Sequence, residues 1–235
     1  MEHQNLLDVK GVSSGYGSLQ VIWDCSLSVG TNESVVVLGS NGSGKTTLLR
    51  AITGVLPLTS GSVLFDGKDV TALPVFRRAR MGMCYVSENS VYPAMTVREN
   101  LSMSSLRSAD GSEEKAAEVH RLFPDILRLD RVRASALSGG QRKMLMVAKA
   151  IVASPKLLIM DEPSSGLSPI FTEKIIEVLS ALKQRGMPML VSEQNIEFAG
   201  LADRLLVLDH GRIVFSGTKE EAERNDAIRS AYFAI

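Results

Sequence analysis

The sequence has little of several features that mark particular classes of protein. Its 26 Lys and Arg residues are balanced by 26 Asp and Glu residues, so the formal net charge is zero. Without excess positive charge there is no strong electrostatic attraction to phosphate backbones, and we do not expect nucleic acid as a partner. The two cysteines, Cys25 and Cys84, stand in apolar segments without metal-ligand spacing. We interpret them as buried thiols in a reducing compartment.

Long apolar runs are also absent. None approaches the roughly 20 residues that a helix needs to cross a bilayer, and the first residues lack the basic and apolar regions of a signal peptide. Hydrophobic residues make up 45% of the 235 residues, and the mean hydropathy is +0.10. These values are typical of a soluble globular chain with one good core. We therefore expect a single domain, 1–235, that cannot move a solute across a membrane by itself.

A glycine-rich segment follows the apolar residues 35–38. It reads Gly39-Ser40-Asn41-Gly42-Ser43-Gly44-Lys45-Thr46, and Thr47 comes next. Glycine is needed where backbone touches a ligand, and the helix expected to begin near Lys45 points its N–H groups at a phosphate. We expect Lys45 to reach the β- and γ-phosphates and the Thr46 hydroxyl to bind Mg²⁺. The segment predicts a site for a nucleoside triphosphate.

Two further motifs follow about a hundred residues later. The first is Leu137-Ser138-Gly139-Gly140-Gln141, and it precedes a helical stretch over 142–152, so its glycines form a second anion-binding helix terminus. The other is the apolar run 157–160 ending in Asp161 and Glu162, at the tip of a buried parallel strand. Asp161 is expected in the Mg²⁺ shell, with Glu162 on the other side of the strand. The alternative for such a pair is a helix N-cap with a solvated neighbour.

These three motifs in this order resemble the ATP-binding subunits of ABC transporters, over residues 6–217. The resemblance implies ATP and Mg²⁺ as ligands, and ATP hydrolysis coupled to transport by separate permease subunits at the cytoplasmic face of a prokaryotic inner membrane. It makes Glu162 the catalytic glutamate that polarises water. The signature motif, residues 138–141, caps the ATP of a second ATPase subunit. Tyr16 matches the aromatic that stacks on adenine; alternatively it packs on a turn.

The resemblance also implies an α/β fold. We expect a P-loop ATPase core over about 1–88 and 154–235 with an antiparallel β subdomain, and an inserted helical subdomain over about 89–153. The alternating residues 6–12 and 26–29 agree with antiparallel strands. Thr96 and Glu99 fit a capping box at the start of the helical part.

Departures from the common family pattern narrow the resemblance. Glu88 stands where most members carry a glutamine near Mg²⁺, Gln194 replaces the switch histidine, and Ser168 replaces an aspartate. Glu88 and Gln194, with the string 193–195 and the segment 95–101, resemble the smaller ATPase subunit of branched-chain amino-acid importers. The urea and short-amide importer ATPase is a close relative. Gln194 can donate a hydrogen bond to the γ-phosphate but cannot carry positive charge.

Other classes of ATPase use the same head. A DNA-repair or chromosome ATPase needs a long heptad insertion, and a translation-associated ABC protein needs two cassettes; neither is present. An exporter ATPase stays open, because the membrane partner largely sets direction. The second ATPase subunit is expected to be a related but different chain, or else a second copy of this one.

The segment from Glu88 to Leu101 joins the nucleotide site to the helical part. It contains the apolar run 91–95 followed by Thr96. We expect part of this run to line a groove for a short helix of the membrane subunit. The alternative is a hinge whose apolar residues pack inward.

Overall fold

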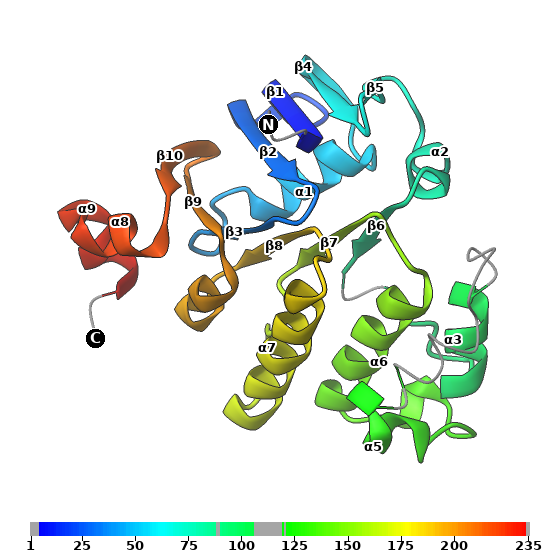
Figure 1. Cartoon of the computed structure of the whole chain (residues 1–235). Helices are drawn as coiled ribbons and strands as arrows, with labels where there is room; N and C mark the ends of the chain where they lie inside the picture. The colour runs from blue at the N-terminus through cyan, green and yellow to red at the C-terminus, as the bar shows by residue number, and fades with distance from the viewer. Residues whose placement is uncertain (1–4, 88–89, 106–118, 120, 234–235) are drawn as a thin grey trace.

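The computed structural model describes residues 5–87, 90–105, 119 and 121–233, and contains two β-sheets (Figure 1). A four-stranded antiparallel sheet has the order β2-β1-β4-β5, and a six-stranded sheet has the order β10-β9-β3-β8-β7-β6. The strands are β1 Asn5–Tyr16, β2 Leu19–Gly30, β3 Ser34–Leu38, β4 Leu58–Phe65, β5 Lys68–Asp69, β6 Met83–Val86, β7 Leu157–Asp161, β8 Met189–Glu193, β9 Arg204–Asp209 and β10 Arg212–Gly217.

The six-stranded sheet is parallel except for β10, which is antiparallel to β9. Helices connect and cover its strands. The helices are α1 Lys45–Thr53, α2 Val75–Arg80, α3 Val97–Ser105, α5 Pro124–Leu127, η2 Ala134–Ala136, α6 Gly139–Val152, α7 Pro169–Gln184, η3 Ile196–Leu201, α8 Lys219–Arg224, α9 Asp226–Ile228 and η4 Arg229–Phe233. Within the described residues, no helix is both long and apolar enough to span a membrane.

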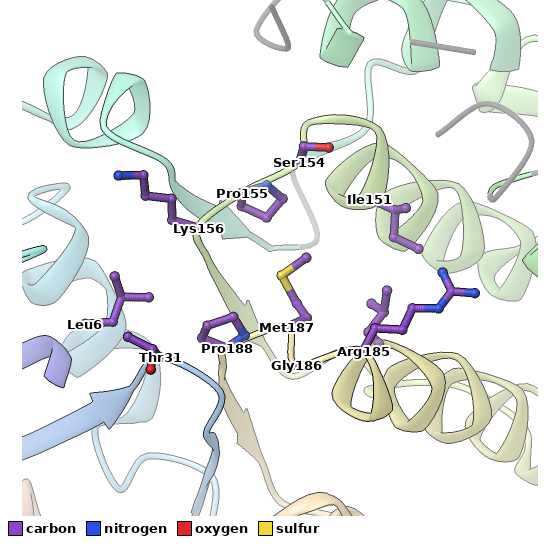
Figure 2. Close-up of a pocket in the computed structure, with 11 residues that line it drawn as sticks. Leu6, Thr31, Ile151, Ser154, Pro155, Lys156, Arg185, Gly186, Met187 and Pro188 are labelled. Carbon is purple, nitrogen blue, oxygen red and sulfur yellow. The ribbon is translucent and has the colours of Figure 1, made fainter. Parts of the chain in front are cut away.

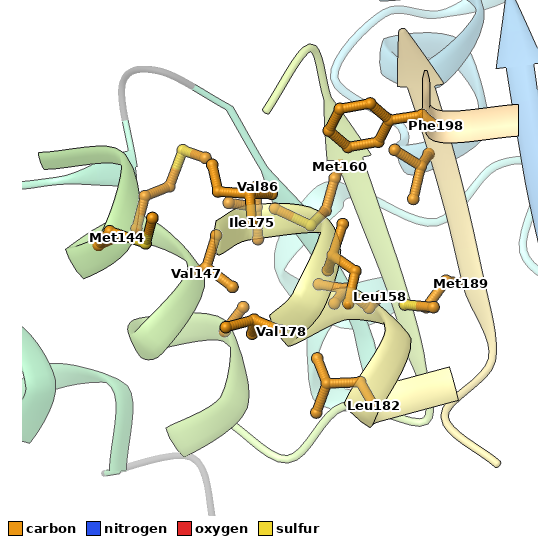
Figure 3. Packing of buried hydrophobic residues seen from close by; sticks show 14 of the residues in the cluster. Val86, Met144, Val147, Leu158, Met160, Ile175, Val178, Leu182, Met189 and Phe198 are labelled. Carbon is orange, nitrogen blue, oxygen red and sulfur yellow. The ribbon is translucent and has the colours of Figure 1, made fainter. Parts of the chain in front are cut away.

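Side-chain alternation along β3 divides the core in two. Val36 and Leu38 face a cluster formed with α6, α7 and η3, and Val35 and Val37 face a cluster shared with α1 and the antiparallel sheet. Figure 3 shows the first cluster, where side chains of α6 and α7 pack against β6, β7 and β8. The strands β3 and β7 are buried on both faces almost throughout, which explains the continuous apolar runs 35–38 and 157–160.

The predicted α/β class with antiparallel and helical parts is confirmed. The segments 6–12 and 26–29 lie in β1 and β2, which pair antiparallel. The helices α3, α5, η2 and α6 all lie between β6 and β7 in the chain, and in Figure 1 α3, α5 and α6 form a group apart from α1. Thr96 and Glu99 form the capping box: each N–H donates to the other side chain.

One buried cation anchors α2 beneath the C-terminal end of α1. Arg78 is 2% exposed, and its guanidinium donates to the backbone carbonyls of Leu73, Ile52 and Thr71. Burial lowers the pKa of Arg78, and the Asp69 carboxylate opposes that effect. Because α1 carries the phosphate loop at its other end, Arg78 helps to fix the helix on which the site is built.

Arg78→Met should lower the free energy of unfolding by about 2–4 kcal/mol, because buried carbonyls lose charged donors. Arg77, exposed on the same helix, provides the control, and Arg77→Met should change stability by less than about 0.5 kcal/mol. Urea unfolding of both variants measures the difference. Equal stability of the two variants would contradict the anchoring role.

Candidate nucleotide site

The site lies at the edge of the parallel sheet where β3, β7 and β8 end. In the strand register Leu38 is paired with Glu193, and Asp161 with Ser192. The phosphate loop leaves β3 at this edge, and the Gly39 N–H donates to the Glu193 carbonyl at 3.2 Å. Ligands of open α/β sheets bind outside the carboxyl ends of the strands, at the point where the strand order reverses.

The phosphate loop closes around the side chain of its own lysine. Lys45 is 3% exposed, and its ammonium donates to the carbonyls of Gly39 at 2.8 Å and Ser40 at 2.9 Å. A Cβ on Gly39 would lie 2.4 Å from the Ser43 hydroxyl and 2.6 Å from the Leu208 carbonyl, so only glycine fits there. Gly44 adopts φ +107 immediately before α1. That left-handed conformation favours glycine.

The arrangement fits a phosphate group. The N-cap of α1 is Gly44, which has no side chain to cap the first helical N–H groups, and the first turn holds no acidic residue. These N–H groups and the positive end of the helix dipole favour an anion. The Ser43 hydroxyl is buried and makes no hydrogen bond among the described residues, so it can serve as a further donor. The predicted segment 39–47 therefore forms one cradle whose geometry fits a phosphate group.

Asp161 is held by three hydroxyl groups from three elements. Its Oδ1 accepts from Thr46 at 3.1 Å and from Ser192 at 2.8 Å, and its Oδ2 accepts from Tyr85 at 3.0 Å. Burial, and then the negative charge of Asp161, raise the pKa of Tyr85, so the phenol stays a donor. The carboxylate is therefore fixed beside the first turn of α1.

Thr46 and Asp161 together fit a Mg²⁺ ion that is bound with a nucleotide. Both are oxygen ligands, the type that Mg²⁺ prefers, and they are adjacent. The described residues contain no group of three or more His, Cys, Asp or Glu side chains that could hold a metal. Phosphate oxygens and water would therefore complete the shell, as is usual for Mg²⁺. Glu88, also predicted near the metal, lies outside the described residues.

Glu162 differs from its predicted orientation. Strand alternation predicts that it lies on the opposite side from Asp161, but β7 ends at Asp161 and Glu162 adopts φ +46. This left-handed turn brings its carboxylate to the ammonium of Lys45, at 3.0 Å. The Glu162 backbone is also fixed, since its N–H donates to the Ser192 carbonyl and its carbonyl accepts from Lys143. Both carboxylates thus face the phosphate loop.

The signature motif begins α6. The Ser138 hydroxyl accepts from the Gln141 N–H, and the Gln141 side chain accepts from the Ser138 N–H, so these two residues form a capping box. A Cβ on Gly140 would collide with the Phe171 ring of α7, whereas one on Gly139 would meet nothing within 4 Å. Gly140 is therefore needed for helix packing, and Gly139 lies at an open surface.

The remaining predicted residues lie around this edge. Tyr16 lies at the end of β1, and its hydroxyl accepts a hydrogen bond from Arg50 of α1. Because the residue is 43% exposed, its ring is available to a ligand. Gln194 is exposed and directly follows β8. Tyr85, Ser192 and Lys143 were missed by the sequence analysis. Ser192 and Tyr85 are the penultimate residues of β8 and β6, the two strands beside β7. A polar residue at the carboxyl end of a neighbouring strand is the sequence signal that could have identified them.

The opposite edge of the sheet has a hollow without such chemistry. Its volume is about 460 Å³, and its lining includes Thr31, Pro155 and Pro188, which precede β3, β7 and β8. Figure 2 shows Lys156 and Arg185 at its margin. Lys156 pairs with Asp66 at the surface. The phosphate cradle and both strand-end carboxylates thus lie at the other edge.

Comparison with known proteins agrees with this geometry. The sequence model of the ABC transporter family matches residues 22–165. The chain is 36% identical to the high-affinity branched-chain amino acid transport ATP-binding protein BraG of Pseudomonas aeruginosa, over 97% of this chain and 99% of that protein. It is 32% identical to the lipopolysaccharide export system ATP-binding protein LptB of Haemophilus influenzae, over 97% of both chains.

Solved structures show the same fold. The ADP conformation of MJ1267, an ATP-binding cassette of an ABC transporter, superposes with a TM-score of 0.82 and 25% identity, over 99% of this chain and 100% of that one. The family match covers more than half of the chain, and the two relatives cover nearly all of it. The chain therefore belongs to the ABC transporter family, as one of its ATP-hydrolysing, ATP-binding subunits.

Proposed function

We propose that residues 39–47 bind the phosphates of ATP, that Thr46 and Asp161 hold Mg²⁺, and that Glu162 polarises the attacking water. One observation carries this assignment: Lys45 and Thr46, adjacent on α1, contact Glu162 and Asp161, adjacent at the end of β7. A phosphate cation, a metal ligand and a general base therefore meet at one point. Phosphoryl transfer needs mainly such positioning and charge neutralisation.

The other predicted residues complete the proposed site. The ring of Tyr16 stacks on adenine, and the amide of Gln194 donates to the γ-phosphate. Gln194 carries no positive charge, so Lys45 and Mg²⁺ supply most of the charge neutralisation within one subunit. Residues 138–141 supply the rest from a second subunit.

Pairing of two ATPase subunits is supported by the surface around Gly139. A hollow of about 150 Å³ lies between the start of α6 and the loop 165–167 that follows the catalytic strand. Gly139 at that helix terminus is exposed, and a side chain there would meet nothing within 4 Å. We propose that it caps ATP held by a partner, which is a related ATPase subunit or a second copy of this chain.

We propose import of branched-chain or other hydrophobic amino acids as the transport function, at the cytoplasmic face of a prokaryotic inner membrane. The similarity to BraG and the string 193–195 support this solute class. The similarity to LptB keeps export as the alternative, beside import of urea or short amides. Co-purification of the permease subunits, followed by solute uptake in vesicles, distinguishes these functions.

A groove beside the helical part is the proposed docking site for a permease segment. Its volume is about 320 Å³, and it is lined by residues that include Tyr92 and Met103, respectively 49% and 44% exposed. Val91 is buried, as the alternative interpretation of the run 91–95 as an inward-packed hinge predicted for all of its apolar residues. Met95 is half-buried and is not among the described residues that line the groove.

The groove contains one buried cation. Lys149 donates to the Ser90 carbonyl and the Asn100 side chain, and its ammonium lies 4.1 Å from the centre of the Tyr92 ring. Burial lowers the pKa of Lys149 to about 8. Cys84, which also lines the groove, opposes the effect of burial on this pKa. Because the hydrogen-bond acceptors of Lys149 are neutral, a short apolar helix with an acidic residue fits the groove.

Replacement of Lys45 and Glu162 separates binding from turnover. Lys45→Ala should abolish measurable ATP binding, because the phosphate cation is lost. Glu162→Gln should bind ATP at least as tightly as the wild type, because Lys45 loses a competing carboxylate, while turnover falls about 100-fold or more. Equilibrium nucleotide binding and phosphate release measure both effects. Lys174→Ala, at a surface ion pair with Asp125, is the control and should change neither.

Undiminished turnover in Glu162→Gln would reject the catalytic role of Glu162. Full ATP binding by Lys45→Ala would reject the phosphate site itself.

The Glu162→Gln variant should be monomeric without nucleotide and dimeric with ATP, because each nucleotide is capped by residues 138–141 of a second subunit. Gly139→Asp, added to that variant, should keep it monomeric, since a carboxylate repels phosphate at a position where a side chain meets no steric obstacle. Light scattering with and without ATP measures both. A persistent monomer would contradict pairing of two copies and indicate an obligatory unlike partner.

Charge substitution in the groove should uncouple transport. Tyr92→Glu and Met103→Glu should each lower solute uptake by about tenfold or more in vesicles with the permease subunits, because a carboxylate disrupts apolar docking. ATPase activity of the separate subunit should stay near normal. Val214→Glu, at an equally exposed position on β10, is the control. Full uptake by both groove variants would contradict docking there.

A further inference from the structure

Glu193 is a buried carboxylate that the proposed roles do not use. It ends β8, is 2% exposed, and lies between the strand that leads into the phosphate loop and the strand that carries Asp161. An ionised side chain at such a position is costly unless its oxygens accept several hydrogen bonds. Its contacts therefore show what it holds.

The contacts of Glu193 reach three loops. Its Oε1 accepts from the Ser164 N–H at 2.7 Å, and Ser164 lies two residues after Glu162. Its Oε2 accepts from the N–H groups of Gln194 at 3.1 Å and Asn195 at 3.3 Å. Its backbone carbonyl accepts from the Gly39 N–H at the start of the phosphate loop. One residue thus joins the loop after Glu162, the loop of Gln194 and the phosphate loop.

The chemistry of these bonds requires a carboxylate. The backbone groups of Ser164, Gln194 and Asn195 that contact the side chain are all N–H donors, so both oxygens must accept. The Ser164 side chain is a further hydrogen-bond partner that favours the ionised form. Burial raises the pKa of Glu193, and the backbone N–H groups oppose that effect by favouring the ionised form. A glutamine of the same shape would keep one accepting oxygen and turn an NH₂ group toward N–H donors, which leaves at least one buried donor unpaired.

The geometry also bears on Glu162. Its backbone is left-handed at φ +46, a conformation that is uncommon for a residue with a side chain and that its surroundings must hold. The Ser192 carbonyl holds its N–H, and Glu193 holds Ser164 on the far side of the turn. Two adjacent residues of β8 therefore fix both ends of the turn that aims the Glu162 carboxylate.

We propose that Glu193 is a positioning residue for ATP hydrolysis, which couples the orientation of Glu162 to that of Gln194 through the two oxygens of its carboxylate. This inference rests on the proposed roles of Glu162 and Gln194. It assigns Glu193 no contact with nucleotide. Loss of the carboxylate should accordingly affect the chemical step and leave nucleotide binding nearly unchanged.

Glu193→Gln should lower kcat by about tenfold to 100-fold, because loosened loops misplace the reacting groups. The Kd for ATP should change by less than about threefold, since the bonds of the phosphate loop to the backbone remain. Glu193→Asp, which keeps the charge but is one methylene shorter, should behave similarly and is the second variant. Phosphate release and equilibrium ATP binding separate the two parameters.

Glu33→Gln is the matched control. Glu33 immediately precedes β3 at the opposite edge of the same sheet, where its carboxylate accepts from the Gly30 N–H and pairs with Arg204. It should lower the melting temperature without lowering kcat. A merely structural role of Glu193 predicts the same result for Glu193→Gln, so a kcat loss found only in the Glu193 variants supports positioning.

A double-mutant cycle tests the coupling. Gln194→Ala should lower kcat in the wild type and have less than about half of that effect, in free-energy terms, when Glu193→Gln is already present. Wild-type kcat in Glu193→Gln, a kcat loss matched by Glu33→Gln, or full additivity with Gln194→Ala would each overturn the inference. Glu162→Gln is measured in parallel: if it turns over normally, the proposed function fails irrespective of the result for Glu193.

Discussion

The parallel register of β3, β8 and β7 is the constraint on which the site depends. Backbone hydrogen bonds place Leu38 beside Glu193 and Ser192 beside Asp161. The phosphate loop, the two carboxylates and the loop of Gln194 therefore leave the sheet at one edge, where hydrogen bonds and an ion pair join them. A slip of one residue would turn Asp161 away from Thr46, because side chains alternate along a strand. The side chains on both faces are packed into the two core clusters, and a slipped register would require all of them to repack.

Buried charges fix the loops that leave this edge. Lys45 binds two carbonyls of its own loop, Lys143 binds the Glu162 carbonyl, and Glu193 accepts three backbone N–H groups. Each charge is costly to bury and is stabilised by fixed backbone dipoles. These buried charges matter because the loops lack the regular backbone hydrogen bonds of a helix or a strand. Charge-assisted bonds replace them and limit how far the reacting groups can move.

The subunit presents its chemistry and its partner surfaces on different elements. The site is on β3, β7, β8 and α1, the signature motif begins α6, and the groove lies between β6, α3 and α6. Lys143 and Lys149 are on the same helix: the first bonds to the loop of Glu162 and the second lies in the groove. The α6 helix thus connects the proposed partner-facing terminus, the loop of Glu162 and the groove.

The sequence by itself determined the phosphate loop, the signature motif, the Asp161–Glu162 pair and the α/β class. The three motifs are local patterns, in which residue types at close spacing indicate the chemistry, and their order along the chain carries the family resemblance that implies the α/β class. Only the tertiary structure decided that Tyr85 and Ser192 hold Asp161, that Glu193 joins three loops, and that Arg78 anchors α1. It also corrected the orientation of Glu162, because strand alternation does not apply beyond the end of β7, where φ is positive. These contacts join residues far apart in the chain, and strand register brings them together, which no local pattern encodes.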